Sequence, residues 1–180
     1  EYTNSFEGSY LLYFDKGSLL SSAYYRHRTG VISRITVIDS IGNTVRTPIN
    51  LAVQDAYGFE FTANLDISQN WRLNGNLNVF HQVTAGDFEG QDFGATNTSW
   101  TTRLSSQWNF TEEIKGQISW FYRGPQVNAQ GSIQAISSVD ASLGVDLFGG
   151  KGSLTLNVRD LFNSRKRRWT IDEPGYFSES

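Results

Sequence analysis

The sequence contains no cysteine among its 180 residues. This absence excludes disulfide bridges, thiolate metal sites and cysteine nucleophiles from the chain. No stretch approaches the ~18 consecutive apolar residues that a membrane-spanning helix needs, so we exclude a helical membrane protein. A β-barrel is compatible with the mean hydropathy of −0.39, because a strand that faces lipid at every second residue is polar on average.

Net charge and aromatic content restrict the possible classes of protein further. The formal net charge of −3 leaves no global basic surface, so we expect no nucleic-acid partner. Aromatic residues make up 14% of this polar chain, and transmembrane barrels place such side chains at both membrane interfaces. Five aromatic residues beside expected short turns could form one of these girdles: Phe14, Trp71, Trp108, Phe110 and Phe148.

Helical periodicity is nearly absent, whereas strand-like alternation recurs between turn signals. We expect about eight strands, at residues 5–14, 19–28, 58–67, 71–83, 100–110, 117–123, 139–147 and 154–159. Short turns connect them near residues 15–18, 68–70, 111–115 and 149–152, and long polar segments occupy 29–50, 84–97 and the stretch after Gly124. The first long segment has its own turn signal at residues 39–43 and predicts a hairpin above a rim. Alternation of short turns with long loops is typical of outer-membrane barrels.

The polar side chains of these strands form rows that a packed core would not accept without many partners. A wet lumen accepts them, and an arginine on the lipid face would cost ~2 to 4 kcal/mol at mid-bilayer. We therefore predict an all-β fold, an antiparallel up-and-down transmembrane β-barrel. The candidate lumen-facing residues are Asn74, Asn76, Asn78, Arg103, Arg123, Asp140, Asp146 and Arg159.

Several short motifs occur in a fixed order along the chain. The clearest is the strand at 154–159 followed by Asp160, Leu161, Phe162 and Asn163, which break the alternation. Residues 121–125 (Phe-Tyr-Arg-Gly-Pro) and 58–61 (Gly-Phe-Glu-Phe) are further motifs of this kind. Together they resemble the C-terminal part of TonB-dependent outer-membrane receptors, in particular the outer-membrane β-barrel family common in Bacteroidetes.

The resemblance implies a barrel of about 22 strands, of which residues 1–180 would be a C-terminal part. The plug domain, the TonB box and the final strand of such a receptor would then lie outside this sequence. It also implies an outer-membrane location in a Gram-negative bacterium and active uptake of a scarce nutrient: a siderophore, cobalamin, a glycan or a peptide. The partners implied are outer-membrane lipid, the plug, and TonB with ExbB and ExbD. The SusC-like branch adds a surface lipoprotein, which nothing in this sequence requires.

The sharpest local feature is the basic cluster Arg165, Lys166, Arg167 and Arg168, followed by Trp169. Either it belongs to a solvated loop, or it contacts the phosphates of lipopolysaccharide at the outer rim. Nucleic acid fits neither the expected position nor the overall charge.

Other candidate chemistry favours ordinary structural roles. His27 and His81 lie in different expected strands without a zinc-binding spacing. The carboxylates of residues 87–92 lack the full calcium-loop pattern. Asp140 and Asp146 are ~20 Å apart along one strand, too far for a glycosidase pair. We expect no enzymatic activity, no cofactor and no metal.

Two other interpretations remain open. The chain could form a complete eight-stranded barrel that acts as an adhesin or structural porin, with its interior filled by satisfied polar side chains. It could also form a soluble β-sandwich that binds carbohydrate through exposed aromatic residues, with its apolar faces packed on each other.

Overall fold

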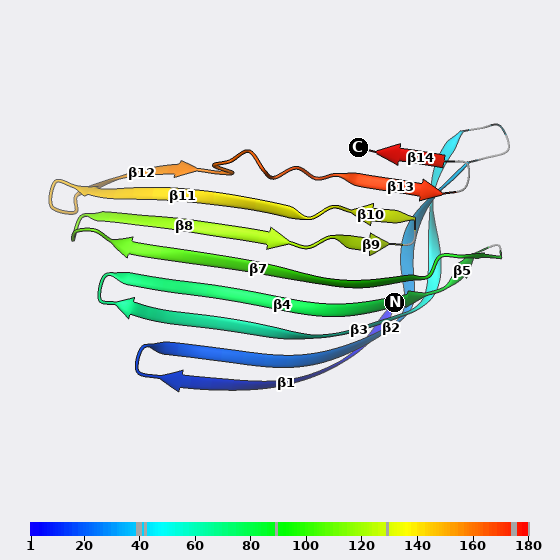
Figure 1. Ribbon diagram of the computed structural model, residues 1–180, viewed down its shortest axis with the longest axis horizontal. Helices are drawn as coiled ribbons and strands as arrows, with labels where there is room; N and C mark the ends of the chain where they lie inside the picture. The colour runs from blue at the N-terminus through cyan, green and yellow to red at the C-terminus, as the bar shows by residue number, and fades with distance from the viewer. Residues whose placement is uncertain (39–40, 42, 89, 129, 174–175, 180) are drawn as a thin grey trace.

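A computed structural model of the chain describes residues 1–38, 41, 43–88, 90–128, 130–173 and 176–179. Eight long strands form one antiparallel sheet in the order β1-β2-β3-β4-β7-β8-β11-β12 (Figure 1). Their bounds are β1 Tyr2–Phe14, β2 Gly17–Ile38, β3 Thr44–Ser68, β4 Trp71–Ala85, β7 Ala95–Asn109, β8 Ile114–Arg123, β11 Ile136–Leu147 and β12 Gly152–Val158. No helix among the described residues has the length and apolar character needed to cross a bilayer. The predicted antiparallel strands are thus confirmed.

Register separates the two faces of the sheet. Phe59 of β3 lies opposite Ala23 of β2 and Val79 of β4, and Leu143 of β11 lies opposite Leu156 of β12. We call this side the apolar face. The residues between them, such as Glu60 opposite Asn78, point to the other side, which we call the polar face.

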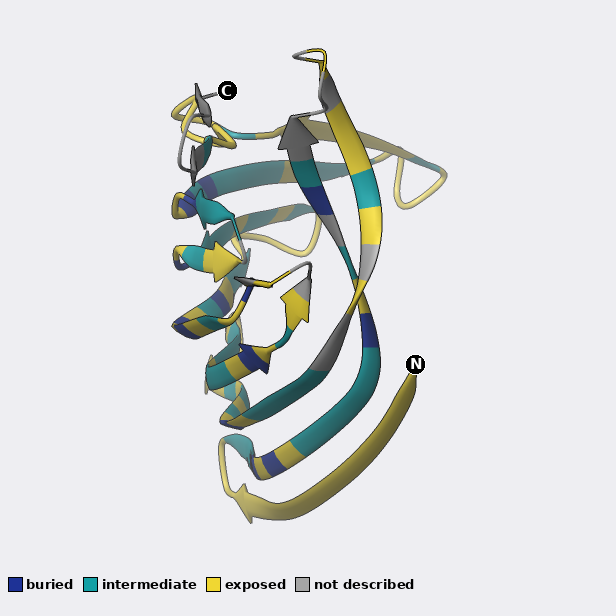
Figure 2. Ribbon diagram, turned by 90° about the vertical axis from the view of Figure 1, so that its right-hand side faces the viewer, coloured by how far each residue is buried: buried dark blue, intermediate teal, exposed yellow. Residues whose placement is uncertain are grey.

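The sheet is a single curved layer. Figure 2 shows an arc that is open on one side, and β1 and β12 are its two edge strands within the described part of the chain. The apolar face is exposed: Tyr10, Phe59 and Leu156 keep 68%, 58% and 62% of their surface accessible. Two apolar faces packed on each other, as a sandwich requires, are not found among the described residues.

Aromatic residues occur at two levels of the apolar face. Near the short turns, Trp71 lies opposite Trp108, whose ring stacks with Phe110. At the second level, Trp100 stacks on Tyr122 with 4.2 Å between ring centroids, and Tyr57 lies against His81. Trp71 and His81 are ~34 Å apart along β4, which corresponds to ~26 Å of height at the ~40° tilt of barrel strands. This spacing matches the ~25 Å apolar band of outer-membrane barrels.

The connections differ at the two ends of the sheet (Figure 1). The short turns gather at one end, and the longer segments gather at the other. The segment between β4 and β7 contains the small hairpin β5 Asp87–Phe88 and β6 Gln91–Asp92. A second sheet, in the order β14-β13-β10-β9, is formed by β9 Gln126–Asn128, β10 Gly131–Ile133, β13 Trp169–Glu173 and β14 Tyr176–Glu179. The predicted asymmetry of the loops is therefore confirmed.

The first long segment corrects the sequence-based prediction. The strands predicted at residues 19–28 and 58–67 are longer on this side, since β2 runs to Ile38 and β3 begins at Thr44. The predicted hairpin is confirmed in its arms, which pair from Val31 opposite Leu51 to Ile38 opposite Thr44. Its turn signal at residues 39–43 lies largely outside the described residues. Figure 2 shows this hairpin rising across the open side of the arc.

Gln130, in the segment between β8 and β11, forms two hydrogen bonds with the β2–β3 hairpin. Gln130 donates from Nε2 to the Thr36 carbonyl over 2.8 Å and accepts from the Thr36 N–H over 2.6 Å. These residues are 94 positions apart in sequence. Several fully or nearly buried apolar side chains also lie at this end, among them Ile35, Phe93 and Ile133. The loop end thus has buried apolar side chains, whereas the apolar face of the sheet is exposed.

Candidate functional site on the polar face

The polar face carries the residues that the sequence marked as lumen-facing. Register and alternation place Asn74, Asn76, Asn78, Arg103, Arg123, Asp140 and Asp146 on this face. Arg159 follows just beyond the end of β12 and borders a shallow hollow with Asp140 and Asn157. That this face lines a lumen stays a prediction.

The middle of the face is a hydrogen-bonded band. Asn76 donates from Nδ2 to Glu60 over 2.8 Å and to Thr62 Oγ1 over 3.1 Å. Arg103 lies opposite Asn76, and its guanidinium sits 5.6 Å from the centroid of the Phe121 ring. Amides and hydroxyls therefore satisfy one another across neighbouring strands, as buried or half-buried polar groups require.

Two carboxylates near the short turns are paired with cations. Asp66 accepts from Arg72 Nε over 2.8 Å, and Asp146 lies 3.2 Å from Lys115 Nζ. All four side chains are well exposed, so each pair contributes no more than ~1 kcal/mol. Asp146 therefore has an ordinary surface role in this structure.

Arg123 differs from these paired groups. Its Nε atom is buried and has no hydrogen-bond partner among the described protein groups, and the same holds for Ser99 Oγ. Thr101 of β7 lies opposite Arg123, which places the arginine in the band next to Arg103. Buried donors without partners cost free energy, so this part of the face is suited to a further polar group or water.

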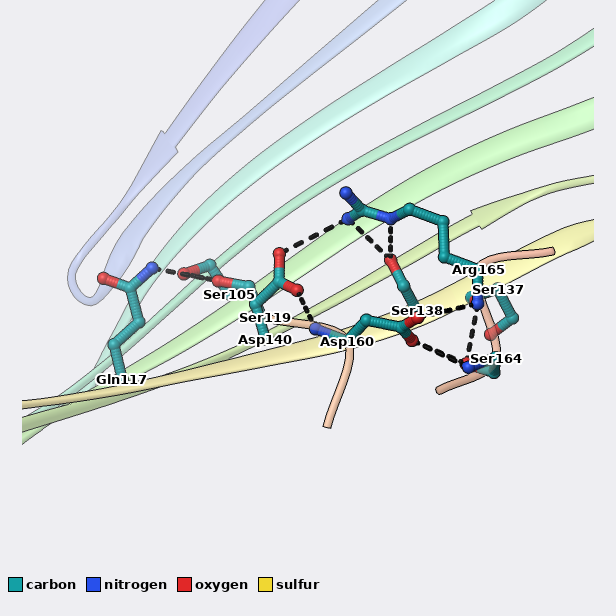
Figure 3. Close-up of polar contacts among 9 residues, drawn as sticks. All are labelled: Ser105, Gln117, Ser119, Ser137, Ser138, Asp140, Asp160, Ser164 and Arg165. Atoms are coloured by element: carbon teal, nitrogen blue, oxygen red, sulfur yellow. Dashed lines mark hydrogen bonds and ion pairs between the residues drawn. The ribbon is translucent and has the colours of Figure 1, made fainter. Parts of the chain in front are cut away.

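The loop after β12 folds back onto the polar face (Figure 3). The Asp160 N–H donates to Asp140 Oδ1 over 2.8 Å, and Arg165 Nη2 lies 3.5 Å from Asp140 Oδ2. Arg165 also donates from Nη2 to Ser138 Oγ over 2.9 Å. The carboxylate of Asp140 thus joins the strand to both ends of the turn that follows β12.

Asp160 organises that turn. Its backbone has φ of 50°, a conformation that aspartate adopts more readily than most residues. Its carboxylate accepts from the N–H groups of Ser164 and Arg165 over 2.8 and 3.0 Å. Desolvation alone would raise the pKa of Asp160, but these hydrogen bonds, one from the Ser164 hydroxyl and the Arg165 charge together lower it. The residues that break the alternation therefore form an ordered turn.

The rest of the basic cluster is exposed. The Arg167 guanidinium lies 5.7 Å from the centroid of the Trp169 ring, and the Arg168 carbonyl accepts from Gln134 N. Contact between this cluster and lipopolysaccharide stays a prediction. For Arg165, the observed partners are Ser138 and Asp140 on the polar face.

A feature that the sequence analysis missed lies farther toward the loop end of the polar face. Tyr24, Arg26, Arg28, Gln54, Asn78 and Gln82 border an open hollow of about 170 Å³. The signal available in the sequence was the Tyr24, Arg26, Arg28 alternation, with two cations on one face of a strand. The sequence does not show the register of the strands, so it could not indicate which amide side chains lie opposite these arginines.

The histidines are on the apolar face near the second aromatic level. His27 Nδ1 lies 2.8 Å from Asp55 Oδ1, which also accepts from the Tyr25 hydroxyl, and His81 Nδ1 lies 2.7 Å from Thr98 Oγ1. No cluster of three metal-ligating residues occurs in the described part of the chain. In the candidate calcium segment 87–92, Glu89 lies outside the described residues.

The model of the outer membrane protein beta-barrel family matches residues 1–180, the whole chain. No curated protein and no solved structure matched it.

Proposed function

The chain belongs to the outer membrane protein beta-barrel family, whose place is the outer membrane, and from this premise we propose that it is a wall segment of a TonB-dependent receptor. In this proposal the receptor imports a scarce nutrient such as a siderophore, cobalamin, a glycan or a peptide. The polar face lines the lumen and contacts the plug, and the apolar face contacts lipid. The proposal includes no catalytic step, cofactor or metal.

The observation that carries this proposal is the open sheet. Strands β1 and β12 are edges, and the arc between them is not closed within the described residues (Figure 2). The unpaired backbone N–H and C=O groups of an exposed edge can pair with another strand, and within a membrane they must be paired. A stand-alone eight-stranded barrel would instead pair β1 with β12. The open arc supports a larger barrel, as a receptor with a plug requires.

The polar face supports the same proposal. A closed eight-stranded barrel fills its interior with its own side chains. Arg123 Nε and Ser99 Oγ, which have no partner within the described part of the chain, and the hollow beside Arg26 and Arg28 fit a face that meets water or a second domain.

The loop end supports a role in substrate capture. The β2–β3 hairpin crosses the open side of the arc and is tied to Gln130. Loops on a rigid scaffold are the usual carriers of binding residues. The proposed partners are the plug, TonB with ExbB and ExbD, and lipopolysaccharide at the outer rim. A surface lipoprotein is an additional candidate.

The test is uptake by cells that produce the full-length protein with and without functional TonB. Labelled siderophore, cobalamin, glycan and peptide are offered in separate arms, and protein levels in the outer membrane are matched. We expect uptake in one arm to fall to background when TonB is lost. Uptake that persists without TonB, in a protein that is present and folded, would contradict the proposal and favour a passive barrel.

A further inference from the structure

The hollow beside Arg26 and Arg28 combines two cations with three amides on one face of the sheet. Arg26 and Arg28 are two positions apart on β2, so their backbones are ~7 Å apart and both side chains point to the polar face. Gln54 of β3 lies opposite Arg28, and Gln82 of β4 lies opposite Ala56. We propose that this hollow binds an oxyanion, a phosphate or carboxylate group, between the two guanidinium groups.

Neighbouring side chains orient the guanidinium groups of Arg26 and Arg28. The Arg26 guanidinium lies 4.5 Å from the centroid of the Tyr24 ring, and the buried Tyr24 donates its hydroxyl to Asn78 Oδ1 over 3.1 Å. Arg28 donates from Nη1 to Gln54 Oε1 over 3.3 Å, and Gln54 donates from Nε2 to Thr84 Oγ1 over 3.1 Å. Stacking and a single amide contact leave most guanidinium N–H groups available. Both side chains are half-buried and oriented before any ligand arrives.

The position of the Tyr24 side chain requires a glycine on the neighbouring strand. Gly58 of β3 lies opposite Tyr24, and a Cβ atom there would be 2.9 Å from the Tyr24 hydroxyl oxygen and closer still to the Val79 carbonyl oxygen. Because Gly58 has no side chain, the Tyr24 hydroxyl lies close over it and reaches Asn78 on the next strand. The contact between Tyr24 and Asn78, which both border the hollow, therefore depends on glycine at position 58.

The charges of the hollow are uncompensated. No aspartate or glutamate borders it, and neither Arg26 nor Arg28 forms an ion pair in the described part of the chain. Glu7 lies on the same face, opposite Tyr24, where it accepts from Ser9 over 3.1 Å. Asp55 is on the apolar face with Tyr25 and His27. Two half-buried guanidinium groups without a carboxylate attract an anion, and paired N–H groups match phosphate and carboxylate oxygens.

The oxyanion can come from two sources. One is a solute that enters the barrel, which would make anionic groups part of the substrate class. The other is an acidic side chain elsewhere in the same polypeptide, in the plug for example. The role in import rests on the proposed function, whereas anion binding itself does not.

The test is titration calorimetry with inorganic phosphate and, separately, acetate on the full-length protein in detergent. The variants are R26Q/R28Q, which removes both charges, and Q54E, which places a carboxylate in the hollow with little change of shape. R72Q is the matched control, because Arg72 is on the same face but lies near the short turns. A heat-dependent shift in gel mobility checks that each variant is folded, and Q54E serves if R26Q/R28Q does not fold.

For a solute source we expect the wild type to bind phosphate or acetate, with affinity about tenfold or more weaker in R26Q/R28Q and Q54E but not in R72Q. For an internal carboxylate we expect no binding by the wild type. The unfolding temperature would then fall more in R26Q/R28Q than in R72Q, which loses only an exposed ion pair with Asp66. Equal binding by all variants, or neither binding nor a stability change, would overturn the proposal. Anion binding together with TonB-independent uptake would keep this site and reject the transport function.

Discussion

Arg165 donates from Nη2 to the hydroxyl of Ser138 over 2.9 Å, although the two residues are 27 positions apart in sequence. Ser138 is only 1% exposed and lies on the polar face of β11. The first residue of the basic cluster is therefore directed to the polar face, where it helps to fix the loop after β12. A role at the outer rim remains for Lys166, Arg167 and Arg168.

The two faces of the sheet should respond differently to a new charge. Leu143 and Leu156 lie opposite each other on the apolar face, and Ser142 and Thr155 are their polar-face neighbours. We expect L143R and L156R to cost ~2 to 4 kcal/mol each in the membrane and to reduce assembly, and S142R and T155R to be tolerated. The folded fraction in outer membranes, read by heat-dependent gel mobility, gives the answer. Equal tolerance at both pairs of sites would reject the assignment of faces.

Asp160 should control the order of the turn after β12. D160A removes the acceptor for the Ser164 and Arg165 N–H groups and makes the positive φ less favourable. We expect chymotrypsin to cleave after the exposed Leu161 and Phe162 about tenfold faster in D160A than in the wild type. D160N, which keeps an oxygen acceptor and tolerates the backbone conformation, should be intermediate. Identical cleavage of all three proteins would show that the carboxylate does not order this turn.

Gln130 should hold the β2–β3 hairpin in place. Q130A removes both hydrogen bonds to Thr36, each worth ~0.5 to 1.5 kcal/mol. We expect backbone amides of residues 31–38 to exchange hydrogen about tenfold faster, with little change in the strands near the short turns. Q134A, at an exposed glutamine of the same loop, is the control. If Q130A and Q134A exchange alike, the contact does not restrain the hairpin.

Gly58 should tolerate no side chain. G58A brings a methyl group against the Tyr24 hydroxyl and the Val79 carbonyl, and we expect a loss of about 1 to 3 kcal/mol in unfolding free energy. Gly144 is on the same face, and the nearest atom to a Cβ there is 3.9 Å away. G144A should therefore change stability by no more than about 0.5 kcal/mol. Urea unfolding of the two refolded proteins in detergent compares them directly, and similar losses would contradict the close packing over Gly58.

The strands and their faces were predictable from the sequence. A period of two assigns Phe59 and Leu77 to one face and Glu60 and Asn78 to the other, and the register of the structure places them on those faces. The turn at Asp160 was also visible, because the alternation stops there. These are local signals, set by residues close in sequence.

The loop end was not predictable in the same way. The sequence predicts a separate hairpin between strands that end at residue 28 and begin again at residue 58, yet pairing between the two arms extends both strands. The contact between Gln130 and Thr36, and the position of Gln54 beside Arg28, depend on register and on segments distant in sequence. Such contacts leave no periodic pattern, so the hollow was not identified.

The most direct measurement is the intact mass and N-terminal sequence of the polypeptide that carries this chain, purified from outer membranes. A wall segment of a TonB-dependent receptor predicts a mass several times the 20.2 kDa of residues 1–180, with a plug-like N-terminal region. A mass near 20.2 kDa would contradict that account and leave a complete small barrel as the function to test.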